Sequence, residues 1–453
     1  MPSKPDGFWQ ATRSGVAAYL AKIGLFSTNA KLVLVYTAFT GLAFGVFQLL
    51  FNFYILSLGS YDELFIGNLQ TAASIAMLVT ALPAAYVVDR FSQKGVMVAT
   101  GVLSAIAFLG IVMFQSAASL IAFRMLAGLA MSTRQIAVAP FLMNNTHDEE
   151  RQYVFSFNFG MMHAAQFVGQ IAGGSLPLIL GNFVGAGPED TISYQLALGA
   201  MTFVSLLAIS PLIWVQEQRS QAGDARATLP WQQLKKHGLL LTTLLLPQFV
   251  IGLGAGTMQP FMNIHFRIVY DKADSVVGIL FAMGALGLTI AQFVAPPMAD
   301  RWGKVRTVIF SQMMSIPFLM LLALGAYLVP AGIIRPEVYF WVAALAFFIR
   351  LSLMNLGGPV YQTFILEQVP PELQAIATSL NMISFQFGWA AMPSISGWFQ
   401  VTFAPFGFVP VFLTVVLLYG TSIIMQSIFF REQIKADRAS LRREASVSYA
   451  PGR

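Results

Sequence analysis

The chain has 453 residues, of which 57% are hydrophobic and 10% are charged, and its formal net charge is +6. A soluble globular fold of this length needs more polar surface than this composition supplies, so the composition excludes one. The chain contains no cysteine, which also excludes disulfide bonds and metal sites built from thiolates.

The chain begins with a mixed segment, residues 1–31, which fits an amphipathic helix on a membrane surface and equally a tail without fixed structure. Twelve apolar runs follow, each long enough to cross a hydrocarbon layer about 30 Å thick as an α-helix. They lack the period-two alternation of membrane strands, which favours helices over a β-barrel. The expected spans are 32–59, 64–87, 95–115, 120–143, 153–182, 194–215, 238–267, 275–298, 305–328, 338–364, 375–404 and 408–430.

A polar stretch at 216–237 separates the sixth span from the seventh, and it is the only long polar stretch between two spans. We interpret it as a linker between two bundles of six helices. It divides the chain into a first bundle at 32–215 and a second bundle at 238–430. A basic tail at 431–453 follows the second bundle.

The basic residues predict how the chain lies across the membrane. With the N-terminus in the cytoplasm, twenty Lys and Arg residues fall on the cytoplasmic side and three, Arg267, Lys272 and Arg335, on the other. This bias predicts that both termini are cytoplasmic, in a multi-pass protein of the plasma membrane or the bacterial inner membrane. Because the basic residues are spread over separate loops, membrane lipids rather than nucleic acids are the expected partners.

A repeat relates the two halves. Asp89-Arg90 and Asp300-Arg301 are 211 residues apart, and each pair ends an apolar run. The same offset links Gly41 with Gly252, Gly45 with Gly256, Gln48 with Gln259, Asn52 with Asn263 and Gly67 with Gly278. Further along, an offset of 223 links Ser156, Asn158 and Gly174 with Ser379, Asn381 and Gly397. The series predicts an all-α membrane protein of 12 transmembrane helices, in two six-helix bundles related by a pseudo-two-fold axis.

Several loops resemble those of the major facilitator superfamily. The stretches AYVVDRFSQK at 85–94 and DRWGKVR at 300–306 resemble its loop signature, although Ala85 and Ser92 stand where glycines are usual. The stretch RMLAG at 124–128 resembles the arginine-glycine motif of its fourth helix. The loops at 149–151 and 370–372 are similar to those after its helices four and ten. The resemblance covers residues 32–430 and implies that family's fold.

The resemblance also implies a set of gating residues at the cytoplasmic side. Asp89 would face the start of the eleventh helix near Ser379, and Asp300 would face the start of the fifth near Ser156. A carboxylate at a helix N-terminus is stabilised by about 0.3–1 kcal/mol, so each contact would hold that side shut. The complete expected set is Asp89, Arg90, Asp300, Arg301, Arg124, Asn158 and Asn381.

Ionisable side chains within the spans are costly and point to a site. Arg134, His163 and Arg350 are expected at similar depths near the middle of the membrane, because each lies several turns inside its helix. Guanidinium groups suit carboxylates and phosphates, so we expect Arg134 and Arg350 to bind an anionic or zwitterionic substrate. His163 would tune the site or carry a proton. A structural role is the alternative for all three.

Amides supply the remaining candidates. Gln48 and Asn52, like Gln259 and Asn263, are four residues apart and therefore share a helix face. They are expected either to hydrogen-bond the substrate or to join the two halves in an outward gate. Further substrate-binding candidates are Gln166, Asn355 and Trp389.

We therefore expect a monomeric secondary transporter or uniporter that moves a small organic anion or zwitterion by alternating access, with proton coupling left open. An exporter of amphipathic drugs or lipids is one alternative. A non-transporting receptor or assembly factor on the same scaffold is another. The sequence has no Walker-type loop, metal-ligand cluster or nucleophile–base pair at supportive spacing, so neither an enzyme nor a cofactor is expected.

Overall fold

The computed structural model describes residues 26–145, 148–216, 235–370 and 373–435. Most of the expected amphipathic segment, of the linker and of the basic tail therefore lies outside the described residues. The regular secondary structure within the described ranges is entirely helical, as the apolar runs predict.

The first half contains six long helices and one short continuation. They are α2 (Thr28–Ser57), α3 (Glu63–Arg90), α4 (Gln93–Met113), α5 (Ala117–Asn145), α6 (Asp148–Val184), α7 (Thr191–Leu207) and α8 (Ser210–Ile213). Side-chain caps fix two of the starts: Asp62 accepts a hydrogen bond from the backbone N–H of Phe65 at 2.9 Å, and Ser92 from that of Gly95 at 2.9 Å.

The second half repeats the pattern. Its elements are α10 (Gly238–Met258), η1 (Gln259–Phe261), α11 (Met262–Tyr270), α12 (Asp274–Trp302), α13 (Lys304–Leu328), α14 (Pro336–Gln368), α15 (Gln374–Thr402) and α16 (Phe408–Phe429). Among the described residues, 11 helical segments are long and apolar enough to cross a membrane. The remaining expected span, the eleventh (375–404), corresponds to α15, which is long enough but is not among these 11 segments.

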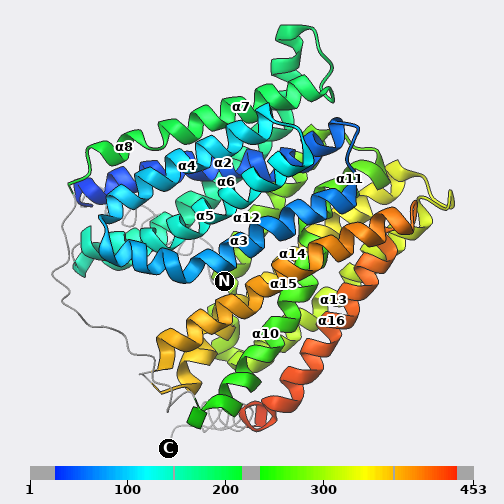
Figure 1. Ribbon diagram of the computed structural model, residues 1–453. Coiled ribbons are helices and arrows are strands. Elements are labelled where there is room, and N and C mark those ends of the chain that lie inside the picture. Colours follow the sequence, from blue (N-terminus) through cyan, green and yellow to red (C-terminus); the bar gives the residue numbers. More distant parts are fainter. Residues whose placement is uncertain (1–25, 146–147, 217–234, 371–372, 436–453) are drawn as a thin grey trace, which may run out of the picture.

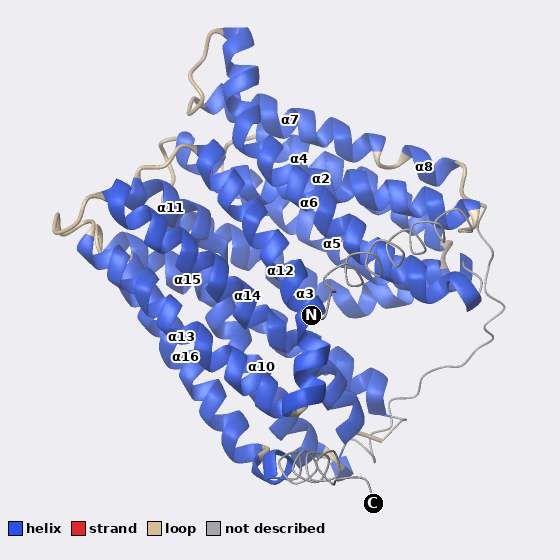
Figure 2. Cartoon of the chain, turned by 180° about the vertical axis from the view of Figure 1, so that it is seen from behind, coloured by secondary structure: helices blue, strands red, loops and turns tan. Residues whose placement is uncertain are grey.

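The helices form two bundles, which Figures 1 and 2 show from opposite sides. Equivalent helices pack in equivalent ways: α2 lies against α6 in the first bundle, and α10 lies against α15 in the second. The bundles meet through two matching pairs, α3 with α15 and α6 with α12. This exchange of contacts is what a pseudo-two-fold axis between the halves requires.

Glycines from the repeat lie where the bundles touch. A Cβ on Gly67 of α3 would collide with the backbone of Pro393 in α15, and one on Gly278 of α12 would collide with the backbone of Gln170 in α6. Gly174 and Gly397, the other matched pair, meet the backbones of α12 and α3 in the same way. Small residues at such crossings let helix backbones approach closely in a membrane.

The apolar core divides the molecule into two ends. One large cluster contains residues of both bundles and lies toward the end with loops 58–62 and 271–273, here called the loop end. Two separate clusters lie toward the other end, one made only of first-half residues and one only of second-half residues. We call this the linker end, because residues 216 and 235 lie there. The bundles separate toward the linker end in Figure 1.

Candidate functional site

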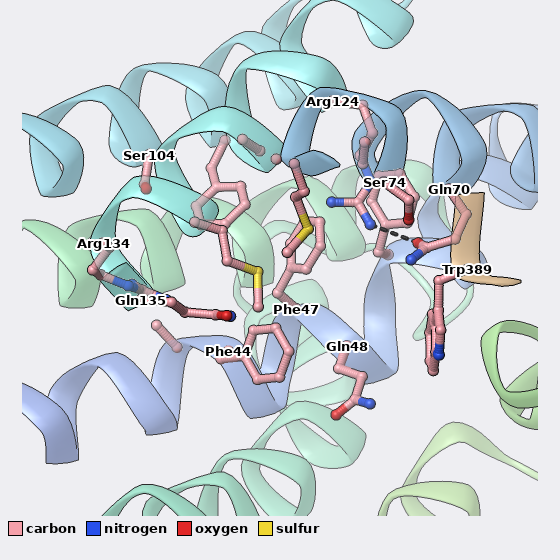
Figure 3. A pocket seen from close by; sticks show the side chains of 18 of the residues that line it. Phe44, Phe47, Gln48, Gln70, Ser74, Ser104, Arg124, Arg134, Gln135 and Trp389 are labelled. Atoms are coloured by element: carbon pink, nitrogen blue, oxygen red, sulfur yellow. Dashed lines mark hydrogen bonds between the residues drawn. The ribbon is translucent and has the colours of Figure 1, made fainter. Parts of the chain in front are cut away.

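A cavity of about 360 Å³ lies between the bundles, a size within the range of small-molecule sites. Helices α2, α3, α4 and α5 of the first bundle supply most of its wall. The second bundle supplies Gln259, Pro260, Asn263, Phe281, Phe385, Gln386 and Trp389. Figure 3 shows part of the wall, with Phe44 and Phe47 between two groups of polar side chains.

The charge of the wall comes from two arginines. Arg124 and Arg134, both on α5, line the cavity, and none of the lining residues is Asp, Glu, His or Lys. Two guanidinium groups without a carboxylate make the cavity positively charged. In a medium of lower dielectric than water, such a charge attracts an anion more strongly than it would in solution.

Arg124 is held by its neighbours at one side of the cavity. Its Nη2 donates a hydrogen bond to Oε1 of Gln70 at 2.7 Å, and Figure 3 shows this bond as a dashed line. The centre of its guanidinium lies 4.7 Å from the ring centroid of Phe51 and 5.1 Å from that of Phe47. Its Nε is buried without a hydrogen-bond partner. The cation–π contacts stabilise the guanidinium, but they leave hydrogen-bonding capacity unused.

Arg134 lies on the opposite side of the cavity. It is ten residues beyond Arg124 on α5 and therefore about 15 Å nearer the linker end. The buried hydroxyl of Tyr36 lies close enough to this guanidinium to interact with it electrostatically. Gln135 stands beside Arg134 in Figure 3. The structure thus places the expected residue Arg134 on the cavity wall.

Arg350 lies elsewhere, in the interior of the second bundle. It has no exposed surface, and its Nη2 donates a hydrogen bond to the hydroxyl of Tyr419 at 2.9 Å. Its Nε and Nη1 have no partner. His163, half-buried on α6, does not line the cavity either. The expected meeting of Arg134, Arg350 and His163 is therefore not what the structure shows, because Arg350 is on the α14 face that looks into its own bundle.

The two asparagines and the two glutamines of the repeat make different contacts. Nδ2 of Asn52 donates to Oδ1 of Asn263 at 2.8 Å and to the carbonyl of Pro260 at 2.6 Å, so this pair joins the bundles. Gln48 and Gln259 line the cavity, as Asn52 and Asn263 also do. The amide oxygen of Gln48 accepts a hydrogen bond from Gln166 at 2.6 Å.

The remaining substrate candidates are also split. Trp389 lines the cavity, and its indole nitrogen is buried without a partner. Asn355 does not line it. Its side chain donates a hydrogen bond to the carbonyl of Leu351 in its own helix at 2.8 Å.

The expected gating residues show no contact between bundles at the linker end among their described side chains. Asn158 accepts a hydrogen bond from Thr37 in its own bundle at 2.6 Å, and Asn381 donates to Gln362 in its own bundle at 3.1 Å. The other expected gating residues lie in different surroundings. Arg90 bonds to Tyr86, Asp300 and Arg301 are exposed, Arg124 lines the cavity, and the side chain of Asp89 lies outside the described structure.

Sequence reasoning missed an ionic cluster at the loop end. Nη2 of Arg267 lies 2.9 Å from Oε2 of Glu189, and its Nη1 lies 3.4 Å from Oδ1 of Asp274. Tyr194 donates to Oδ2 of Asp274 at 2.5 Å. Arg267 and Asp274 belong to the second half, whereas Glu189 and Tyr194 belong to the first. The available signal was that Arg267 is one of only three basic residues expected on that side.

Sequence reasoning also missed Gln70 and Tyr36, the neutral neighbours of the two cavity arginines. Gln70 holds Arg124 by a hydrogen bond, and Tyr36 lies near Arg134. Both residues stand inside apolar runs, where one polar group gives no indication of which helix it faces.

Comparison with known proteins agrees with this architecture. A family model described as Major Facilitator Superfamily matches residues 32–393, and again residues 248–451. No curated protein sequence matches the chain. Among solved structures, nucleoside transporter NupG is similar, with a TM-score of 0.65 at 14% identity over 89% of this chain and 98% of that one.

Two further solved structures share the fold. A D-xylose-proton symporter has a TM-score of 0.65 at 15% identity, over 88% of this chain and 97% of its own. A bacterial homologue of the iron transporter ferroportin, in an inward-facing state, has a TM-score of 0.68 at 12% identity, over 88% of this chain and 98% of its own. At such low identities these likenesses concern the fold alone.

Proposed function

Because the chain belongs to the major facilitator superfamily, a family of membrane transporters, we propose that it is a secondary transporter or uniporter of a small organic anion or zwitterion. The observation that carries the proposal is the charge of the cavity wall: among the described residues that line it, Arg124 and Arg134 are charged and none is Asp or Glu. The two guanidinium groups would repel a cation, whereas they would attract an anion.

The two ends of the molecule support an alternating-access cycle. The positive-inside bias assigns the linker end to the cytoplasm. The bundles share a core and an ionic cluster at the loop end, and their cores are separate at the linker end. On this assignment the structure is an inward-facing state. The Asn52–Asn263 bond and the Arg267 cluster then serve as the outer gate.

Proton coupling finds no support on the cavity wall. The lining residues include no carboxylate and no histidine, and His163 lies off the wall. We therefore propose uniport or exchange of one anion for another, because neither needs a titratable side chain at the site.

Uptake into liposomes tests the proposal. Purified protein is reconstituted, a panel of radiolabelled organic anions is supplied outside, and uptake is compared with that of protein-free vesicles. Arg134→Gln should slow uptake of any transported anion several-fold, because it removes one of the two charges that attract the anion into the cavity. The matched control is Arg335→Gln, an exposed arginine in a loop, which should transport normally. Equal uptake by the two variants would refute the anion site.

The aromatic wall favours a second candidate. Phe44, Phe47, Phe51, Phe108 and Phe281 line the cavity, which suits the apolar body of an amphipathic drug or lipid. A lipid exporter would move a labelled lipid between leaflets in the same vesicles. Lipid movement without anion uptake would select this candidate, and neither activity would select a non-transporting scaffold.

A further inference from the structure

The polar groups of the cavity near Arg124 are almost all hydrogen-bond donors. The amide oxygen of Gln70 is occupied by Arg124, so its NH₂ group remains to donate. The amide oxygen of Gln48 is likewise occupied, by Gln166 at 2.6 Å and by Gln170 at 3.4 Å. The buried indole N–H of Trp389 has no acceptor. The Nε of Arg124 is also buried, and the described residues supply no acceptor for it or for the indole N–H.

We call Arg124, Gln70 and Trp389 the donor cluster. In Figure 3 they gather on one side of the cavity, while Arg134 and Gln135 lie on the other. Arg124 is seven residues from the start of α5 at Ala117, which places the donor cluster toward the loop end. Buried donors without partners cost free energy, so a ligand rich in acceptors would be favoured at the cluster.

Aromatic rings continue from the donor cluster toward the linker end. Phe51, Phe47 and Phe44 follow one another along α2, and the ring centroids of Phe47 and Phe108 are 4.6 Å apart. Each of these four residues lines the cavity. Flat rings pack against such a wall in offset or edge-to-face arrangements more favourably than flexible alkyl chains do.

We infer that the substrate is an aromatic monocarboxylate, bound with its carboxylate on the donor cluster and its ring against the aromatic wall formed by Phe44, Phe47 and Phe108. This inference rests on the proposed transport of an anion and adds the substrate class and its orientation. The carboxylate accepts from Arg124 and Gln70 of the first bundle and from Trp389 of the second. A ligand in this position therefore links the bundles at the closed end of the cavity. Arg134, nearer the linker end, attracts the anion but does not hold it.

Four probes of matched shape test the substrate class. They are 3-phenylpropanoate, its amide 3-phenylpropanamide, the cation 3-phenylpropylammonium, and hexanoate, an anion without a ring. Binding is measured by titration calorimetry on full-length protein in lipid nanodiscs. We expect 3-phenylpropanoate to bind at least about 10-fold more tightly than the amide, hexanoate to bind several-fold more weakly, and the cation not to bind. Absence of binding by 3-phenylpropanoate overturns the inference.

Variants test the orientation. Arg124→Gln should weaken binding of 3-phenylpropanoate by about 10-fold or more, and Arg134→Gln by less than about 3-fold. Trp389→Phe keeps a ring but loses the N–H, and should weaken binding by about 3- to 10-fold. Its matched control is Trp398→Phe, which changes an exposed tryptophan on the same helix and should bind normally. Should Arg124→Gln fail to fold, the two tryptophan variants still decide.

The outcomes separate this inference from the proposed function. If 3-phenylpropanoate binds and depends on Arg134 but not on Arg124 or Trp389, the orientation is wrong and anion transport stands. If only hexanoate binds, the aromatic class is wrong and anion transport stands. If the amide or the cation binds as tightly as the carboxylate, both proposals fall.

Discussion

Each bundle buries an arginine within a long helix, and the two bundles use it differently. Arg124 of the first bundle lines the space between the bundles, and its buried Nε has no hydrogen-bond partner in the described structure. Arg350 of the second bundle is fully enclosed, with the hydroxyl of Tyr419 as its hydrogen-bond partner. An arginine inside a membrane span thus marks a binding site only where its helix face borders the cavity. Elsewhere it is a buried cation that the surrounding packing must accommodate.

A third arginine, Arg267, differs from both in how its charge is compensated. Arg267 is partly buried like Arg124, but it lies beside the carboxylates of Glu189 and Asp274. Carboxylates compensate its charge, whereas Arg350 has no carboxylate partner among the described residues. We propose that a ligand compensates the charge of Arg124. Substitutions at these arginines and at their partners distinguish the three kinds of environment.

The largest effect is expected from Arg267→Met. Asp274 is only 8% exposed and would lose its nearby cation. Removing one partner of a buried ion pair costs about 3–5 kcal/mol, so the Tm of the purified protein should fall by several degrees. The double variant Arg267→Met/Asp274→Leu should recover most of that loss, because it leaves no uncompensated charge. A single variant as stable as Arg335→Gln would show that the cluster contributes little to closure.

Tyr419→Phe should have an intermediate effect. It removes the hydroxyl that accepts from Arg350, and a hydrogen bond to a charged group contributes about 1.5–3 kcal/mol. The Tm should therefore fall, and anion binding should not change. In a protein that already carries Arg350→Met, the same substitution should have no such cost. Equal costs in both backgrounds would mean that Tyr419 acts through packing alone.

Arg350→Met should have the smallest effect. Methionine fills a similar space without a charge, and replacing buried charges by apolar groups is often neutral or stabilising. The Tm should stay level or rise, and the dissociation constant for the transported anion should not change. Weakened anion binding in this variant would restore Arg350 to the site and remove the contrast with Arg124.

The architecture was readable from the sequence. The apolar runs predicted the helices, and the repeat of Gly67 at Gly278 and of Gly174 at Gly397 identified positions that the structure places at the bundle contacts. Length and periodicity suffice for this, because a membrane helix needs only a sufficiently long apolar run. A single motif glycine would not have been enough; the shared offset was the informative part.

The site was only partly readable. Arg134 was expected at the cavity and lies there, whereas Arg350 was expected there and is enclosed. The difference is one of rotation: α14 is apolar on nearly every side, so its sequence does not reveal which face looks toward the other bundle. Arg267 was expected only as a basic residue at the outer end of its span, and its ionic partners were not foreseen. Hydropathy does not register a charge that is buried by partners from distant helices.

The glycine crossings have a consequence for motion. At Gly67, Gly174, Gly278 and Gly397 the bundles touch backbone to backbone, with no side chain interposed. Because no side chains interdigitate at these crossings, the two bundles can rotate against each other there without repacking side chains. Replacing any of these four glycines by a larger residue should hinder that rotation and lower the turnover number. The affinity of the cavity for its substrate should stay the same.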